Sequence, residues 1–184
     1  INMEIKHIRR TATALLVALS LWCLNAKAQQ ATEVDLDEQY ATELLKPGTV
    51  APDFELPSPD GKKVGLSQFK GKYVVLDFWA SWCPDCRKDA PNIVAMYNRF
   101  KDKGVAFVGV SFDIDAALWK AALEKYGMKY AHVSELKKMR EANISKAYGV
   151  KWIPSMVLID PEGKVVMGTV LSKKLERKLE ELLR

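Results

Sequence analysis

The run VVLDFWASWCPDC, residues 74–86, decides the fold and the chemistry expected of this chain. Residues 74–79 are apolar and rich in β-branched side chains apart from Asp77, a pattern typical of a buried strand. Cys83 and Cys86 follow three residues apart, and a helical pattern begins at once. Both sulfurs should therefore lie in the first turn of one helix, where unpaired N–H groups and the helix dipole stabilise a thiolate. A strand that leads into such a turn indicates a centre for dithiol/disulfide exchange.

The cysteine count favours a redox role over a structural one. Of the three cysteines, Cys23 lies in a segment that we expect to be removed. A disulfide between Cys83 and Cys86 closes too small a loop to stabilise a fold much, although two buried structural thiols remain an alternative. A zinc site needs about four ligands, whereas the sequence offers His132 and scattered carboxylates. Covalent haem attachment needs a histidine after the second cysteine, where Arg87 stands. We expect neither a metal nor a cofactor.

The beginning of the chain has the pattern of a secretory signal peptide over residues 1–28. Residues 3–10 carry three Lys or Arg, residues 11–24 are uncharged and mostly apolar, and Ala26-Lys27-Ala28 fits a cleavage site. We expect the mature protein in the periplasm or on the extracytoplasmic face of the membrane. An uncleaved anchor is the alternative, although the apolar stretch is short for a span of about 20 residues.

The charge balance gives no sign of a nucleic-acid partner. Residues 1–28 hold four basic residues and one acidic residue, so their removal lowers the formal net charge from +5 to +2. The basic character of the full chain is thus largely a targeting effect, and no basic stripe is interleaved with aromatic residues.

The remaining sequence predicts an α/β protein with a mixed sheet. Residues 29–47 are interpreted as a linker or peripheral helix, and residues 48–184 as one domain. Strands that alternate with helices imply parallel units, and a hairpin near the end implies an antiparallel edge. Strands are expected at 53–56, 64–66, 73–80, 105–112, 130–133, 155–159 and 164–170, and helices at 84–100, 115–126, 139–148 and 172–183, with Ser172 as the cap of the last one.

Several segments resemble those of a known family. The run DFWASWCPDC is similar to the active-site segment of thioredoxin, and APDFEL from residue 51, GVSFD from 109, AYGVKWIPSMVLID from 147 and DPEGKVV from 160 resemble the secreted TlpA/ResA-like branch. The resemblance covers residues 48–184. It implies a thioredoxin-like fold, a mixed central sheet flanked by helices, with an N-terminal hairpin and a helix–strand insertion over residues 113–133.

The same resemblance implies partners. Protein disulfides or dithiols are the expected substrates, and apocytochrome c is a candidate because cytochrome c maturation is one role of the family. An upstream electron donor in the membrane is expected to reduce the disulfide back to the dithiol. We expect a monomer.

Four residues are candidates for the chemistry. Cys83 leads the helix and is the expected attacking thiolate, while Cys86, one turn in, is expected to resolve the mixed disulfide. Burial should raise the pKa of Asp77, and the resemblance implies a proton relay to Cys86. A purely structural aspartate paired with a lysine, or one that faces solvent, is the alternative. Asp89 lies nearly one turn beyond Cys86, and either tunes the dithiol or only favours the helix dipole.

A second segment is expected to bind substrate. The resemblance implies that the Ile153–Pro154 bond is cis and lies against the dithiol, which leaves neighbouring backbone groups free to pair with a substrate strand. A trans proline that opens the following strand is the alternative. Trp82 and Trp152 are expected to flank the sulfurs as an apolar rim.

The function predicted from these patterns is that of a thiol–disulfide oxidoreductase. Asp85 and Asp89 place negative charge near Cys83, and like charge disfavours a thiolate, so we expect a reductase rather than an oxidant. A thiol peroxidase and a non-catalytic redox- or metal-sensing module remain the alternatives. Peroxidatic sites want Thr or Ser three residues before the cysteine and a proline upstream, where Ala80 and Leu76 stand.

Overall fold

The computed structural model describes residues 35–184. The signal peptide predicted at residues 1–28, and residues 29–34 of the predicted linker, lie outside the described residues. Contacts divide the chain into Ile1–Asp35 and Leu36–Arg184, and the fold described below is that of the second unit.

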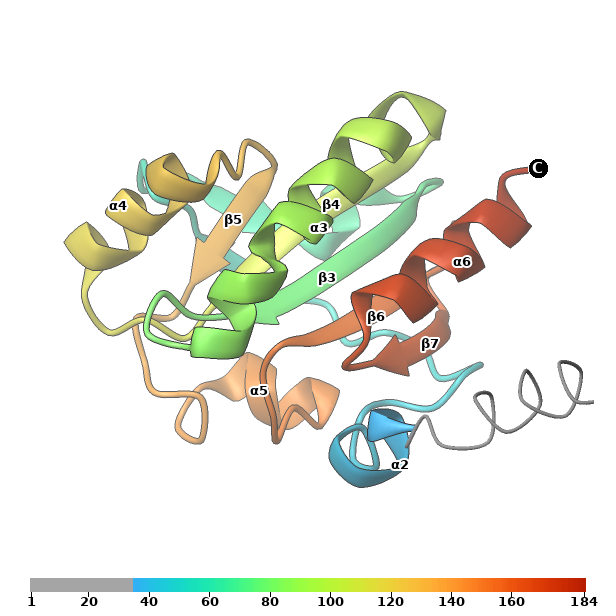
Figure 1. The fold of residues 1–184 in the computed structure, drawn as a ribbon, viewed down its shortest axis with the longest axis horizontal. Coiled ribbons are helices and arrows are strands. Elements are labelled where there is room, and N and C mark those ends of the chain that lie inside the picture. The colour runs from blue at the N-terminus through green and yellow to red at the C-terminus, as the bar shows by residue number, and fades with distance from the viewer. Residues whose placement is uncertain (1–34) are drawn as a thin grey trace, which may run out of the picture. The chain divides into compact units, whose positions relative to one another are not determined.

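A five-stranded mixed sheet forms the centre of this unit, in the order β5-β4-β3-β6-β7 (Figure 1). Central β3 pairs in parallel with β4 and antiparallel with β6, and helices cover both faces of the sheet, so its residues other than Asp77 can be apolar on both faces. The mixed sheet expected from the sequence is thereby confirmed. The strands are β3 (Tyr73–Trp79), β4 (Val105–Ser111), β5 (Ala131–Ser134), β6 (Ser155–Ile159) and β7 (Val165–Thr169), while β1 (Glu55–Pro57) and β2 (Lys63–Gly65) form a separate hairpin.

Helices cover both faces of the sheet. α3 (Pro84–Phe100) crosses in front of β3 and β4 in Figure 1, and α6 (Ser172–Leu182) lies beside it over β6 and β7. Arg99 of α3 ties the two helices together by ion pairs to Glu176 and Glu180 of α6. α5 (Asn143–Tyr148) packs on the opposite face, since its Tyr148 ring contacts Phe78, which points away from the face that Asp77 occupies.

The insertion expected between residues 113 and 133 contains α4 and β5. Asp115 caps α4 (Ala116–Tyr126) by accepting hydrogen bonds from the N–H groups of Ala117 and Leu118, and Gly127 ends it in the left-handed region at φ 64°. β5 then pairs in parallel with β4 at the edge of the sheet.

Two details differ from the sequence prediction. The helix predicted at 139–148 begins only at Asn143, where the carboxylate of Glu135 accepts a hydrogen bond from Ile144 N–H, a contact that no local pattern indicates. The predicted cap of the last helix is also wrong. Ser172 is the first helical residue and donates its hydroxyl to Asp89, while Leu171 holds the cap position without a side-chain bond.

A short helix, α2 (Leu36–Tyr40), precedes the hairpin. Its Asp37 accepts hydrogen bonds from the Thr169 hydroxyl and the Val170 N–H, and pairs with Lys174 at 2.6 Å. These bonds dock α2 against the end of β7 and the start of α6.

Candidate functional site

The two cysteines form a disulfide at the start of α3. Cys83 is the N-cap, and its Sγ accepts a hydrogen bond from the N–H of Cys86 at 3.1 Å. Both side chains are buried at the end of β3, whereas the neighbouring Trp82 is 54% exposed. The sulfur that the helix N–H groups stabilise is therefore that of Cys83.

The predicted substrate-binding segment lies against Cys83. The Ile153–Pro154 peptide bond is cis, and the Ile153 carbonyl oxygen lies 3.6 Å from the Cys83 sulfur. Residues 74–86 and this proline segment are therefore brought together although 70 residues separate Ile153 from Cys83.

The two tryptophans of the predicted rim are held in different ways. Trp82 donates its indole N–H to the Phe112 carbonyl at 3.4 Å. Trp152 is 41% exposed and contacts Tyr40 of α2 with the two rings tilted by 31° and their centroids 4.4 Å apart. The sequence analysis missed Tyr40, because no local signal connects the N-terminal helix with a residue more than a hundred positions later.

Asp77 is buried on the face of β3 that α3 covers. Its carboxylate accepts a hydrogen bond from the Tyr130 hydroxyl at 3.0 Å, so its partner is a tyrosine and not the lysine considered above. Burial raises the pKa of Asp77 from 3.8 to about 7, the Tyr130 hydrogen bond opposes that rise, and the charge of Asp89 adds to it. A carboxyl group with such a pKa can exchange a proton near neutral pH.

Asp89 is half-buried one turn beyond Cys86 on α3. It accepts hydrogen bonds from Ser172 at 2.7 Å and Asn92 at 2.8 Å, so its carboxylate also joins α3 to the start of α6. Tyr97 of α3 contacts the ring of Tyr130, whose hydroxyl donates to Asp77, so α3 packs on the face of the sheet that Asp77 occupies. Cys86 and Asp89 lie at the start of this same helix, and the charge of Asp89 adds to the rise in the pKa of Asp77.

Asp113 holds the turn that precedes the cysteines, a role the sequence analysis did not foresee. Its buried carboxylate accepts hydrogen bonds from the N–H of Ser81 at 3.0 Å and from the hydroxyls of Ser81 at 2.5 Å and Ser111 at 2.7 Å. Arg87 donates to the Ser81 carbonyl at 3.1 Å. The only hint was the position of Asp113 directly after a buried strand.

His132 is a second buried titratable group near Asp77. Neither of its ring nitrogens has a hydrogen-bond partner among the described residues, and burial lowers its pKa from 6.5 to about 3. Its ring contacts that of Tyr130 in a tilted arrangement, with centroids 4.3 Å apart. At neutral pH the imidazole is therefore uncharged.

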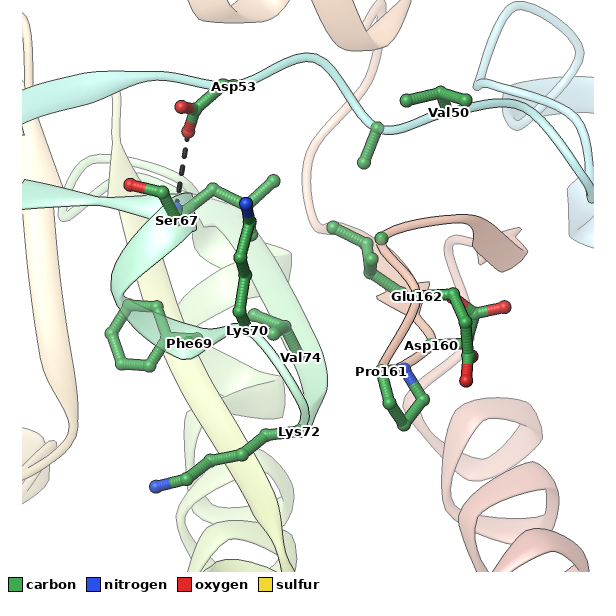
Figure 2. Close-up of a pocket in the computed structure, with 14 residues that line it drawn as sticks. Val50, Asp53, Ser67, Phe69, Lys70, Lys72, Val74, Asp160, Pro161 and Glu162 are labelled. Atoms are coloured by element: carbon green, nitrogen blue, oxygen red, sulfur yellow. Dashed lines mark hydrogen bonds between the residues drawn. The ribbon is translucent and has the colours of Figure 1, made fainter.

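A cavity of about 370 Å³ opens at the other end of the sheet (Figure 2). Val74 at the start of β3 and Ile159 at the end of β6 line it, together with Lys70, Lys72 and Glu162. None of the predicted site residues lines this cavity, so it is separate from the dithiol. Among residues 35–184, no cluster of three or more His, Cys, Asp or Glu side chains could hold a metal ion, and no helix is long and apolar enough to cross a membrane.

Comparison with known proteins identifies the family. The AhpC/TSA family model matches residues 47–167. The thiol-disulfide oxidoreductase ResA of Bacillus thuringiensis subsp. konkukian is 33% identical over 142 residues, which cover 77% of this chain and 79% of that protein. The chain belongs to the ResA-like thiol-disulfide oxidoreductases.

Three further thiol-disulfide exchange proteins support the same assignment. ResA of Bacillus subtilis is 36% identical over 124 residues, which cover 67% of each chain. The thioredoxin domain of a thiol-disulfide oxidoreductase from Bacteroides vulgatus superposes with a TM-score of 0.70 at 36% identity, covering 76% of this chain and 99% of that one. A thiol:disulfide interchange protein from Chlorobium tepidum, described as a DsbE, superposes with a TM-score of 0.69 at 33% identity, covering 76% of this chain and 99% of that one. The thioredoxin-like fold expected from the sequence is confirmed, and the chain is an oxidoreductase of dithiols and disulfides.

Proposed function

We propose that this protein reduces disulfides of partner proteins outside the cytoplasm, using the dithiol of Cys83 and Cys86. The observation that carries the proposal is the position of Cys83 at the N-cap of α3, where its sulfur accepts the Cys86 N–H. In the reduced protein the same N–H can stabilise a Cys83 thiolate, the species that attacks disulfides.

The reaction transfers two electrons to the substrate. The Cys83 thiolate attacks one sulfur of the substrate disulfide, so a mixed disulfide forms and the other substrate sulfur leaves as a thiolate. Cys86 then loses its proton and attacks the Cys83 sulfur. This second step breaks the mixed disulfide, releases the second substrate thiolate and leaves the Cys83–Cys86 disulfide.

Asp77 is proposed as the acceptor of the Cys86 proton. Burial places its pKa at about 7, which lets it take a proton near neutral pH and return it to a leaving thiolate. Asp89 is proposed to tune this step through its charge, because it acts on Asp77 while it is bound to α6.

Substrate binding is proposed for the rim around Cys83. Trp82 and Trp152 are partly exposed and directly precede Cys83 and Ile153 in the chain, and the Ile153 carbonyl lies next to the Cys83 sulfur. An extended substrate segment could pair with backbone groups next to Pro154 while its disulfide meets Cys83.

A reducing direction is proposed from the charges of the first helical turns. The carboxylates of Asp85 and Asp89 disfavour a nearby thiolate, and a dithiol whose thiolate is weakly stabilised is a reductant. Apocytochrome c is the proposed candidate substrate, and a membrane protein the proposed electron donor. The proposed location rests on the signal-peptide pattern of residues 1–28.

Two assays run side by side test the activity. We expect the mature protein to accelerate insulin reduction by dithiothreitol and to leave hydrogen peroxide unconsumed. Peroxide consumption without insulin reduction would instead support a thiol peroxidase, and inactivity in both would support a redox- or metal-sensing module. A Cys86→Ser variant should trap partners as mixed disulfides in the periplasm, and their identification would name the substrate.

A further inference from the structure

We infer that Tyr130 is a positioning residue for Asp77, and that its hydroxyl sets the pH range in which Asp77 can take the proton of Cys86. The inference rests on the proposed function, in which Asp77 is that proton acceptor. Nothing in the sequence pattern pointed to Tyr130, which lies 53 residues from Asp77 at the edge of the insertion.

The hydrogen bond between the two side chains is enclosed on all sides. Tyr130 donates to Asp77 at 3.0 Å, and both residues are buried. The register neighbours of Asp77 are Gly109 in β4 and Met156 in β6, and neither has a side chain that can donate a hydrogen bond. Among residues 35–184, Tyr130 is thus the donor on which the Asp77 carboxylate depends.

Aromatic rings fix the direction of the Tyr130 hydroxyl. The Tyr130 ring contacts His132, Tyr97 and Phe107, with centroids 4.3, 5.4 and 6.0 Å away. Gly109 makes this packing feasible, because a Cβ at that position would overlap the His132 ring. A ring held by three neighbours cannot turn its hydroxyl away from Asp77 without disturbing the core.

The charges around Asp77 leave its ionised form in need of this donor. From α3, Asp89 faces it with a negative charge, and Cys86 is uncharged in the disulfide. From β5, His132 is neutral because burial lowers its pKa to about 3, and burial raises the pKa of Tyr130. None of these groups is a cation. The ionised Asp77 carboxylate is therefore stabilised by the neutral Tyr130 hydroxyl and not by the positive charge of a lysine.

Loss of the hydroxyl should therefore shift the titration of Asp77 upward. A hydrogen bond to a charged group corresponds to about 1 to 2 pH units in a titration. In Tyr130→Phe the pKa of Asp77 should rise by that amount, and the ionised fraction at pH 6 should fall about 10- to 100-fold.

The first experiment follows the Asp77 carboxyl carbon by NMR across pH 4 to 10 in the oxidised protein. Tyr97→Phe is the matched control, because it removes a hydroxyl from the same ring cluster but not from the Asp77 hydrogen bond. We expect the titration midpoint of Asp77 to move to higher pH in Tyr130→Phe and to remain unchanged in Tyr97→Phe. An unchanged midpoint in Tyr130→Phe, or equal shifts in both variants, would overturn the inference.

The second experiment measures disulfide reduction as a function of pH. The acidic limb of the profile should move to higher pH in Tyr130→Phe, and Tyr130→Phe should add no further shift to an Asp77→Asn variant. A Tyr130→Phe profile that matches the wild type would overturn the role in proton transfer. If the wild type reduces no disulfide while the NMR midpoint still moves, the proposed function fails and the hydrogen-bond effect on Asp77 stands.

Discussion

Replacement of Asp77 by asparagine should make the oxidised protein more stable, and more so at higher pH. The folded state raises the pKa of Asp77 from 3.8 to about 7, so folding favours the protonated form. Ionised Asp77 therefore lowers the free energy of unfolding; this destabilisation is absent below about pH 4 and complete above about pH 7. A rise of about 3 units, at about 1.4 kcal/mol each, gives a penalty of about 4 kcal/mol. Asparagine has the same shape as aspartate and keeps an oxygen that can accept the hydrogen bond from the Tyr130 hydroxyl.

Urea unfolding of the oxidised wild type and Asp77→Asn at pH 5, 7 and 9 measures this effect. The free energy of unfolding of Asp77→Asn should exceed that of the wild type by about 2 kcal/mol at pH 5 and by about 4 kcal/mol at pH 9, because the folded Asp77 keeps its proton up to about pH 7 whereas the unfolded one is ionised above about pH 4. Asp102→Asn, on the exposed turn after α3, is the control and should show no such trend. A variant whose stability follows that of the wild type at every pH would refute the account of Asp77 as a carboxylate penalised by burial.

Three further predictions concern the dithiol and His132. In the reduced protein, iodoacetamide near neutral pH should label Cys83 much faster than Cys86, and equal rates would contradict the assignment of the attacking thiolate. Asp85→Asn should raise the reduction potential by a few tens of millivolts at most, as measured against a dithiothreitol buffer, and a wild-type value near about −120 mV would exclude the reductase. His132 binds a proton more readily in the unfolded chain, so its own contribution to stability should fall by about 2 kcal/mol between pH 7 and pH 5, opposite in sign to that of Asp77. Urea unfolding in an Asp77→Asn background should therefore show this fall, and His132→Phe in the same background should remove it; a fall that persists would show that another group causes it.

The sequence was sufficient to predict the parts of the site that lie close together in the chain. The strand at 73–79 and the helix at 84–100 follow from uninterrupted apolar and helical patterns, so the position of both cysteines could be predicted. The burial of Asp77 followed from its place within an apolar strand.

The parts that the sequence did not reveal depend on contacts across the sheet. Tyr130 reaches Asp77 only because β5 is placed beside β4, and β4 beside β3. Likewise, Asp113 and Ser81 meet because two strands end at the same edge. Sequence periodicity indicates which face a side chain takes, but not which neighbour it meets.

The contact between Tyr40 and Trp152 limits how far the N-terminal part of the chain can be shortened without altering the rim. A chain that began at residue 48 would retain both cysteines and all five strands of the central sheet. It would lose the ring that covers one side of Trp152, and with it the anchor that Asp37 provides at Thr169 and Val170. The newly exposed Trp152 indole would enlarge the apolar surface of the rim, so the rim would bind other apolar surfaces less selectively. Under the proposed function, α2 is therefore part of the substrate-binding rim, although it lies outside the sheet and far from the cysteines in the chain.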